Sequence, residues 1–402
     1  MVHPVSITAA AVISGLGVTC EEHTQALLRR ETALKLLGQL PGSPPSFSHL
    51  PAAWIADRAL LKGRRSGAAS NLLVRAAQAC VERAGWSSRD LRETWIYAGT
   101  SRANQGEWRN PIPFRRALRQ FAASNSLHSE IAAAVSLVLG IRGPWQVLSN
   151  GCASGLDALG HAWLALAAGL TDRVLVLSVD LPLSTDMLED FADSGMLSAV
   201  GKNDPYATTA DGFLPGEAAV ALCLERSDLA GARQLARILT YRANSDALDL
   251  IRLPEDGGPL ADLLTSVHQD LKTSGISTGP NLPALICPHA SGTKANADSE
   301  CRGIEQALDA FAAETPEPIP VAVFKPQTGH ALGASGLLEV ALLLPFLSKG
   351  HCPPQLEGLS EPPSPRLRLC HATDPLGSGQ VWKIASGMGG HNAVAVLDFP
   401  GD

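Results

Sequence analysis

The chain has 402 residues, of which 45% are hydrophobic and 18% charged, and its net charge is −7. This composition supplies a large core and excludes an intrinsically disordered chain, which combines low hydrophobicity with high net charge. Nucleic-acid-binding proteins are usually basic, so the acidic balance disfavours that class as well.

The sequence also argues against a secreted or membrane-spanning protein. Residues 1–15 predict a strand and not a signal peptide, because they have neither a basic head nor a cleavage site. We find no apolar run of about 18 residues, the length that a membrane span needs. The eight cysteines have no Cys-x-x-Cys spacing and are too sparse for a disulfide scaffold. We therefore expect a cytoplasmic protein with free thiols.

The first half of the chain alternates strands and helices. Apolar and β-branched runs predict strands over residues 6–14, 95–97, 145–148, 173–179 and 218–224. Helical spacing of apolar residues predicts helices over residues 21–30, 68–84 and 153–170. The unit formed by residues 145–179 is strand, turn, helix and strand, which implies a parallel sheet.

The second half repeats this arrangement. Strands are predicted over residues 236–241, 284–287, 321–324, 382–385 and 393–399. Helices are predicted over residues 260–273, 299–313 and 337–347. The Pro-rich segments predict a surface loop over 38–52 and irregular structure over 352–380. The chain therefore predicts an α/β fold of two similar halves, residues 1–230 and 231–402.

Cys152 is the first candidate for chemistry, since it lies directly after one predicted strand and before a predicted helix. A helix N-terminus carries unpaired N–H groups and partial positive charge, which predicts a lowered pKa and a nucleophilic thiolate. The small neighbours Gly151, Ala153 and Gly155 suit a tight turn that substrate approaches closely. For Cys152 taken alone, a buried and unreactive thiol is the alternative.

His289 and His330 also follow predicted strands. Open α/β sheets bind ligands at the carboxyl ends of their strands. Either histidine alone fits a structural role. Two histidines and Cys152 in equivalent positions indicate a functional site.

Five segments resemble motifs of the β-ketoacyl-acyl-carrier-protein synthases of types I and II, and they occur in the order of that family. They are Gly151-Cys152-Ala153-Ser154-Gly155-Leu156, Asp211-Gly212-Phe213 with Gly216-Glu217, His289-Ala290-Ser291-Gly292-Thr293 with Glu300, Lys325 to His330 with Gly333 to Gly336, and Ser386 to Asn392. Thiolases share the fold, but they end in a second catalytic cysteine where this chain has Met388.

The resemblance implies a thiolase-like fold, in which two duplicated α/β halves form five layers, α-β-α-β-α. It also implies a decarboxylating Claisen condensation, which joins an acyl group on Cys152 to malonyl-acyl-carrier protein and gives a 3-oxoacyl-acyl-carrier protein. His289 and His330 then stabilise the enolate that is left by loss of carbon dioxide. The backbone N–H groups of Cys152 and Met388 form the oxyanion hole.

The resemblance implies supporting roles for other residues. Lys325 pairs with Glu300 and holds the electrostatics of the histidines, and Ser291 and Thr293 contact the phosphopantetheine arm. The C-terminal turn is supported by Gly389, Gly390 and Asn392. We expect no metal ion and no bound cofactor, because the substrates travel on the phosphopantetheine arm of an acyl carrier protein.

Two basic clusters are candidates for docking that acidic carrier protein, and a solvated basic surface is an equal alternative. They comprise Lys62, Arg64, Arg65, Arg115, Arg116 and Arg119. A homodimer is expected, and a heterodimer with a second ketosynthase-like subunit stays open. Two other functions also stay open, namely a partner subunit of the chain-length-factor type and a non-catalytic carrier-protein-binding protein. Such partner subunits typically lack the nucleophile, and Cys152 therefore argues against the first of these.

Several positions depart from the family's motifs. Gly151, Ala290, Pro326, Met388 and His391 stand where the motifs have Ala, Gly, Ser, Phe and Thr. Because none of these changes removes a catalytic group, they indicate a divergent member in fatty-acid or specialised polyketide or polyene biosynthesis, and they favour a specialised pathway over housekeeping fatty-acid synthesis. The flexible Met388 in place of the gating Phe predicts an acyl pocket that admits unusual chains.

Overall fold

The computed structural model describes residues 2–63, 65–106, 122–125, 127–274, 282–311, 318–372, 374–376 and 379–399. The first half contributes the sheet strands β1 (Val5–Ser14), β4 (Trp95–Gly99), β5 (Trp145–Leu148), β6 (Arg173–Asp180) and β7 (Ala218–Arg226). The second half contributes β8 (Ala236–Ser245), β9 (Pro283–Cys287), β10 (Ile319–Val321), β11 (Leu367–Leu369), β12 (Gln380–Gly387) and β13 (His391–Asp398). A separate small pair consists of β2 (Leu34–Leu36) and β3 (Pro51–Ala53).

The two halves have the same strand order and directions. In the first half β5, β4 and β6 are parallel, and β7 and β1 continue the sheet antiparallel. In the second half β10, β9 and β12 are parallel, and β13 and β8 continue it antiparallel. β11 adds one parallel strand, and the start of β1 pairs with β8 and joins the halves. The predicted duplicated α/β architecture is confirmed.

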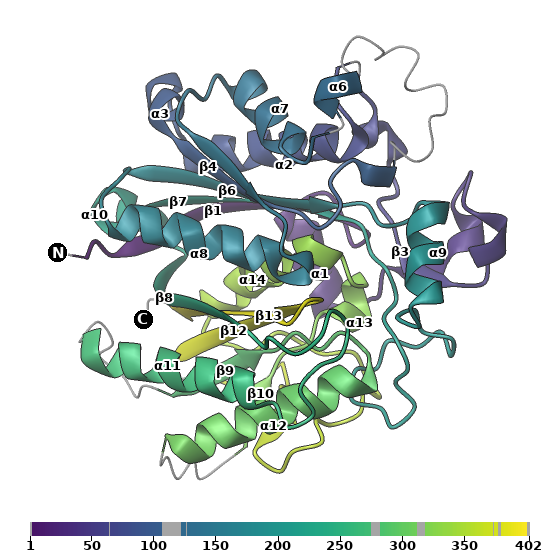
Figure 1. Cartoon of the computed structure of the whole chain (residues 1–402). Coiled ribbons are helices and arrows are strands. Elements are labelled where there is room, and N and C mark those ends of the chain that lie inside the picture. The colour runs from purple at the N-terminus through teal and green to yellow at the C-terminus, as the bar shows by residue number, and fades with distance from the viewer. Residues whose placement is uncertain are drawn as a thin grey trace.

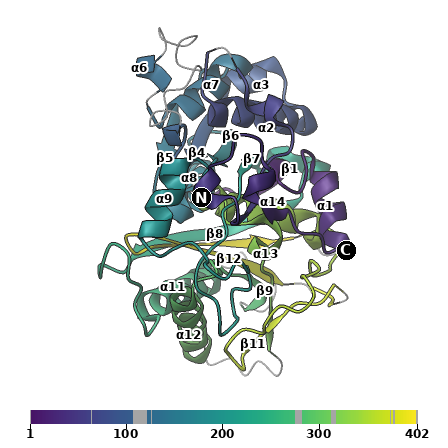
Figure 2. The ribbon, with the colours of Figure 1, turned by 90° about the vertical axis from the view of Figure 1, so that its right-hand side faces the viewer.

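Helices cover both sheets and fill the space between them (Figure 1). The outer layer of the first half holds α2 (Ala68–Ala84), α3 (Ser88–Glu93) and α7 (Glu130–Leu139). The middle layer holds α1 (Cys20–Leu28), α8 (Ser154–Ala167) and α14 (Ser335–Leu347). The outer layer of the second half holds α11 (Gly258–Ser274) and α12 (Lys294–Ala310), as the rotated view in Figure 2 also shows. These are the five layers that the resemblance implies. Shorter helices are α6 (Ala122–Asn125), α9 (Thr185–Asp193), α10 (Ser227–Ala230) and α13 (Lys325–Thr328).

The apolar sequence of α14 explains its central place. A helix that is apolar on all sides is buried on all sides, and nearly every residue from Ser335 to Leu347 is buried. Packed between the two sheets, α14 carries one acidic residue, Glu339, into the interior. This position becomes important for the site below.

Most predicted elements are present with shifted ends. The helix over 68–84 and the strand over 145–148 have the predicted bounds. α8 begins later than predicted, because residues Gly151–Ala153 form a 3₁₀ turn, and α12 begins at Lys294, because Thr293 caps it. Helices α7 and α9 and strand β11 were not predicted from the sequence, and β11 lies in the segment predicted to be irregular.

Two further predictions concern the cysteines and the helices. All eight cysteines lie in the described part of the chain, and each is a free thiol there. Among the helices of the described ranges, none combines the length and the apolar character that crossing a membrane requires.

Candidate active site

Cys152 lies in a sharp turn between β5 and α8. Gly151 has φ +61°, a left-handed value that glycine adopts at little cost. The Ser154 hydroxyl fastens the turn, because it accepts a hydrogen bond from the N–H of Asn150 (2.9 Å) and donates one to the C=O of Gly151 (2.6 Å). This local network fixes Cys152 at the N-terminal end of a buried helix.

The predicted lowering of the Cys152 pKa is wrong. Burial raises the pKa of this thiol to about 12, and Asp180 adds to the effect, whereas the charges of Lys325 and Arg102 oppose it. A helix N-terminus stabilises an anion by only about 0.3–1 kcal/mol at exposed sites, less than the cost of burying a charged sulfur. Cys152 is therefore a thiol at neutral pH, and its attack on a substrate needs a base.

The imidazole rings of His289 and His330 lie close to the sulfur of Cys152. Its Sγ and one ring nitrogen each of His289 and His330 lie within 4.8 Å of one another, and the two ring centroids are 5.3 Å apart. Burial lowers the pKa of His289 well below its usual value, and the charges of Lys325, His330 and Lys383 lower it further. Burial and both lysines lower the pKa of His330 in the same way. Both rings are thus neutral at neutral pH, so each has one N–H to donate and one nitrogen to accept a proton.

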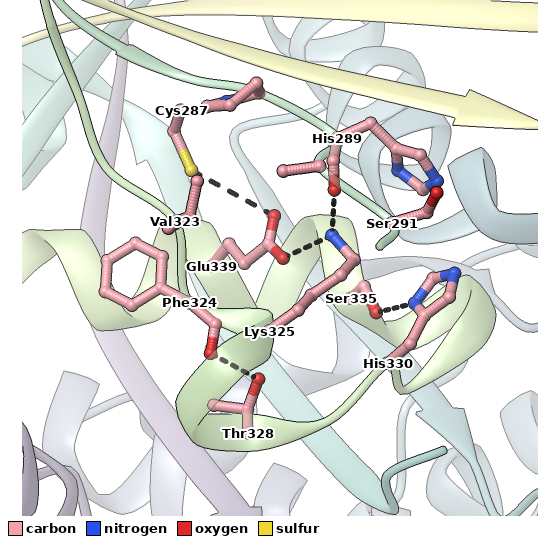
Figure 3. Close-up of polar contacts among 12 residues, drawn as sticks. Cys287, His289, Ser291, Val323, Phe324, Lys325, Thr328, His330, Ser335 and Glu339 are labelled. Carbon is pink, nitrogen blue, oxygen red and sulfur yellow. Dashed lines mark hydrogen bonds and ion pairs between the residues drawn. The ribbon is translucent and has the colours of Figure 1, made fainter. Parts of the chain in front are cut away.

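The His330 ring is held from two sides. Its Nδ1 lies 2.8 Å from the hydroxyl of Ser335, at the start of α14 (Figure 3). The ring of Phe213 packs against it edge to face at a centroid distance of 5.1 Å. With Nδ1 engaged by Ser335, Nε2 is the nitrogen left for substrate.

Lys325 does not pair with Glu300, and that prediction is wrong. Its ammonium group lies 2.7 Å from Glu339 on α14 and donates a hydrogen bond to the C=O of His289 (Figure 3). Glu300 instead accepts hydrogen bonds from the N–H groups of His289 (2.5 Å) and Ala290 (2.9 Å). Glu300 therefore fastens the backbone of the histidine loop, and Lys325 contacts that loop from the other side.

Glu339 and Lys383 are site residues that the sequence analysis missed. The Lys383 ammonium lies 2.6 Å from Glu339, so one buried carboxylate serves two buried lysines. Lys383 also donates hydrogen bonds to the C=O groups of Cys287 (3.2 Å) and Pro288 (3.1 Å), which lead into His289. One feature of the sequence could have indicated them. Glu339 is a single acidic residue within an apolar helix, and a buried charge requires a partner of opposite charge.

Met388 lies in the turn between β12 and β13, opposite the Cys152 turn. A Cβ placed on Gly151 would lie 3.5 Å from the backbone nitrogen of Met388, and one on Gly387 would lie 3.2 Å from that of Cys152. The backbones of the two turns are therefore in close contact, as two donors of one oxyanion hole require. The Met388 side chain is 38% exposed.

The other residues of the predicted site flank these two turns. The hydroxyls of Ser291 and Thr293 lie 3.2 Å apart, in the loop that follows His289. The Asn392 side chain donates a hydrogen bond to Asp246 (2.6 Å) and accepts one from Ser386 (2.7 Å). Gly389 and Gly390 have φ values of +82° and +75°, which allow the tight turn between β12 and β13.

Ala290 keeps a left-handed conformation, φ +42°, where the family motif has Gly. The Ala side chain therefore occupies a left-handed backbone conformation that favours glycine.

An apolar cluster borders the sulfur of Cys152. It comprises Met187, Phe191, Phe213 and Leu332. The guanidinium of Arg102, which the sequence analysis did not single out, lies 5.5 Å from the ring centroid of Phe191. Apolar side chains therefore lie directly beside Cys152.

Cys152, His289 and His330 also offer the donor types of a zinc site, one sulfur and two imidazoles. Two buried ammonium groups, those of Lys325 and Lys383, are close enough to lower the pKa of both histidines. The same positive charge repels a metal cation. The arrangement therefore fits the stabilisation of a developing negative charge better than the binding of a metal ion.

Comparisons with known proteins identify the family of this chain. The family model "Beta-ketoacyl synthase, N-terminal domain" matches residues 57–230, and "Beta-ketoacyl synthase, C-terminal domain" matches residues 235–358. The tetracenomycin polyketide synthase ketoacyl synthase alpha subunit of Streptomyces glaucescens is 29% identical over 284 residues, 68% of this chain and 64% of the relative. The actinorhodin polyketide putative beta-ketoacyl synthase 1 of Streptomyces coelicolor is 30% identical over 284 residues, 67% of this chain and 58% of the relative. These matches thus span less than two thirds of either relative.

Solved structures show the same fold. A type II polyketide synthase ketosynthase, in complex with its acyl-carrier protein and bound to the hexaketide, matches with a TM-score of 0.83 and 22% identity over 100% of both chains. The ishigamide ketosynthase/chain length factor matches with a TM-score of 0.83 and 21% identity, again over 100% of both chains.

The strand order and the solved structures together define the class, that of α/β proteins with the thiolase-like fold. The chain belongs to the β-ketoacyl synthase family.

Proposed function

We propose that the chain is a decarboxylating condensing enzyme of polyketide or fatty-acid biosynthesis, with Cys152 as its acyl-carrying nucleophile. The observation that carries this proposal is the cluster of Cys152, His289 and His330, whose three donor atoms lie within 4.8 Å of one another. A thioester on Cys152 remains activated for the formation of a carbon–carbon bond. Two neutral imidazoles supply donors for an enolate oxygen.

The first half-reaction transfers an acyl group to Cys152. The thiol attacks the thioester carbonyl of an acyl carrier protein, and a neutral imidazole accepts its proton. That proton then passes to the departing phosphopantetheine sulfur, so that the carrier leaves as a free thiol. The N–H groups of Cys152 and Met388 stabilise the oxyanion. Ser291 and Thr293 contact the arm on which the substrate arrives, and the proposed chemistry needs no bound cofactor.

The second half-reaction forms the carbon–carbon bond. The bond between the malonyl carboxylate and its neighbouring carbon breaks, carbon dioxide leaves, and the electron pair forms an enolate held by His289 and His330. Donation from Nε2 of His330 requires that Ser335 donates its hydroxyl proton to Nδ1. The enolate carbon attacks the acyl carbonyl on Cys152, whose thiolate leaves and takes up a proton.

Acyl transfer from a carrier protein tests the proposal directly. Wild-type protein and the Cys152→Ala variant are incubated with a panel of acyl-carrier-protein thioesters, and intact masses are measured. We expect an acyl adduct on the wild type alone, because the variant has no nucleophile at that position. If no donor acylates the wild type, or if the variant is acylated equally, the proposed role of Cys152 is wrong.

The alternative reading, a partner subunit of the chain-length-factor type, receives less support. A subunit of that type does not need a nucleophile, whereas this chain holds Cys152 beside both histidines. A heterodimer that contains this chain as its active subunit remains compatible with the proposal.

The proposed carrier-protein docking rests on exposed basic residues. Lys62 and Arg65 are exposed, whereas Arg64, Arg115, Arg116 and Arg119 lie outside the described residues. We predict that the double variant Lys62→Glu and Arg65→Glu raises KM for carrier-bound substrate, because an acidic carrier loses charge complementarity. KM for a small acyl thioester should be unchanged, and equal effects on both substrates would exclude docking at this surface.

A dimer is proposed through the edge of the first half. β5 is the last strand of the described sheet on this side, and an edge strand offers unpaired N–H and C=O groups. Trp145 on β5 is 39% exposed, and Leu137 on the neighbouring α7 is 82% exposed. This edge is suited to pairing with a second copy of this chain or with a related subunit.

A further inference from the structure

A polar cluster connects the two turns that carry the candidate oxyanion hole. Asp157, in the first turn of α8, has a side chain that is only 1% exposed. Its carboxylate accepts hydrogen bonds from the amide of Asn150 (2.7 Å) and the hydroxyl of Tyr241 (2.6 Å). Nε2 of His391 lies 2.8 Å from the same carboxylate.

These contacts are made by residues close in sequence to both proposed oxyanion-hole donors, the N–H groups of Cys152 and Met388. Asn150 lies two residues before Cys152, and His391 lies three residues after Met388. Asp157 belongs to the first half of the chain and His391 to the second, so their ion pair crosses between the halves. Because the Met388 turn is in close backbone contact with the Cys152 turn, a shift of either changes the spacing of the two N–H groups.

Charge balance at Asp157 accounts for only part of this arrangement. Asp157 already has two neutral hydrogen-bond donors, Asn150 and Tyr241, but a buried carboxylate also requires a positive partner, which protonated His391 supplies. What His391 adds is a contact made from the turn that bears Met388, and a positive charge when it is protonated. This links the position of the turn to the protonation of one side chain.

We propose that His391 is a positioning residue, which in its protonated form pairs with Asp157 and holds the N–H of Met388 at its working distance from that of Cys152. The inference rests on the proposed function, because it concerns the oxyanion hole of that reaction. Acyl transfer then proceeds fastest while the ion pair is intact.

The charges around His391 determine the direction of the pH effect. Asp157 raises the pKa of His391, burial opposes this, and the more distant Asp246, on the segment after β8, raises it further. Burial raises the pKa of Asp246 itself, which the Asn392 side chain counteracts. Because the folded-state pKa of His391 is raised, the pair is complete at low pH and is lost as pH rises through that pKa. His289 and His330 titrate on the acid side, and the alkaline limb therefore reports on His391.

The test measures the rate of Cys152 acylation by a small acyl thioester, an N-acetylcysteamine ester, across the pH range with intact-mass readout. His391→Thr removes the pair, and we expect about a tenfold slower acylation at pH values below the His391 pKa, since small misplacements of catalytic groups are costly. His391→Gln keeps a neutral donor toward Asp157 but no positive charge, so we expect the reduced rate that the wild type shows above the His391 pKa, without an alkaline decline. The exposed His351→Gln variant is the matched control and should follow the wild type.

The outcomes separate this inference from the proposed function. If the wild type is not acylated at all, the proposed function fails. If the wild type is acylated and both His391 variants keep its rate and its alkaline decline, His391 is not a positioning residue. Two variants that lower only the melting temperature, with unchanged rates, would also overturn the inference.

Discussion

Replacing either histidine is expected to lower malonyl decarboxylation by about 10²–10³-fold, the usual effect of removing one donor to a developing anion. In His289→Ala and His330→Ala, the enolate oxygen loses one of its two N–H donors. Acylation of Cys152 should suffer less, because the remaining imidazole still serves as the base. The measurement is the release of carbon dioxide from malonyl carrier protein, together with the mass of the acylated enzyme.

The pH dependence provides an independent readout of the same histidines. Because burial and the nearby lysines lower the pKa of both, they stay neutral until the pH falls well below 6.5, the ordinary value for histidine. Protonation of these two histidines should therefore leave activity intact at neutral pH and lower it only at acid pH. A loss of activity on the acid side that is centred at or above the ordinary histidine pKa would contradict two buried, neutral histidines. Histidine variants that decarboxylate malonyl carrier protein at the wild-type rate would contradict their proposed role.

Glu339→Gln is expected to destabilise the protein by about 3–5 kcal/mol, the cost of leaving buried charges without their partner. Glu339 is the carboxylate that pairs with both Lys325 (2.7 Å) and Lys383 (2.6 Å), and all three side chains are at most 2% exposed. The change preserves shape but removes the negative charge between two ammonium groups. The free energy of unfolding from urea titration measures the effect.

An exposed ion pair provides the matched control. Arg29 and Glu31 lie 2.7 Å apart with half-exposed side chains, and such a pair contributes about 0–1 kcal/mol. Glu31→Gln should therefore leave the free energy of unfolding nearly unchanged. Lys383→Met should cost less than Glu339→Gln, because Glu339 keeps Lys325 as its partner. Equal losses for Glu339→Gln and Glu31→Gln would contradict the buried network.

The residues of the candidate site were predictable because motifs place them at the ends of strands. Cys152, His289, Lys325 and His330 each follow a strand or lie in the turn after one, and parallel strands bring such ends to one edge of a sheet. Local signals were also sufficient to predict the bounds of α2. This helix ends at Gly85, which has a left-handed conformation with φ +66°. Short-range patterns therefore predicted both the fold class and the composition of the cluster.

What could not be predicted depends on packing between distant segments. Lys325 meets Glu339 and not Glu300, because α14 runs through the middle layer beside the histidine loop. The high pKa of Cys152 reflects its burial, which no local pattern around the turn reveals. Lys383 lies in a predicted strand and belongs to no motif. Only the fold brings its ammonium group to the C=O groups of Cys287 and Pro288, next to His289.

A single-turnover condensation tests the central claim most directly. Enzyme that has been acylated on Cys152 is mixed with malonyl-acyl-carrier protein, and carbon dioxide and 3-oxoacyl-acyl-carrier protein are quantified together. We expect one equivalent of each per acylated Cys152, with loss of the acyl mass from the enzyme. Persistence of the acyl enzyme without a condensed product, in the presence of a malonyl carrier protein that other ketosynthases accept, would contradict it.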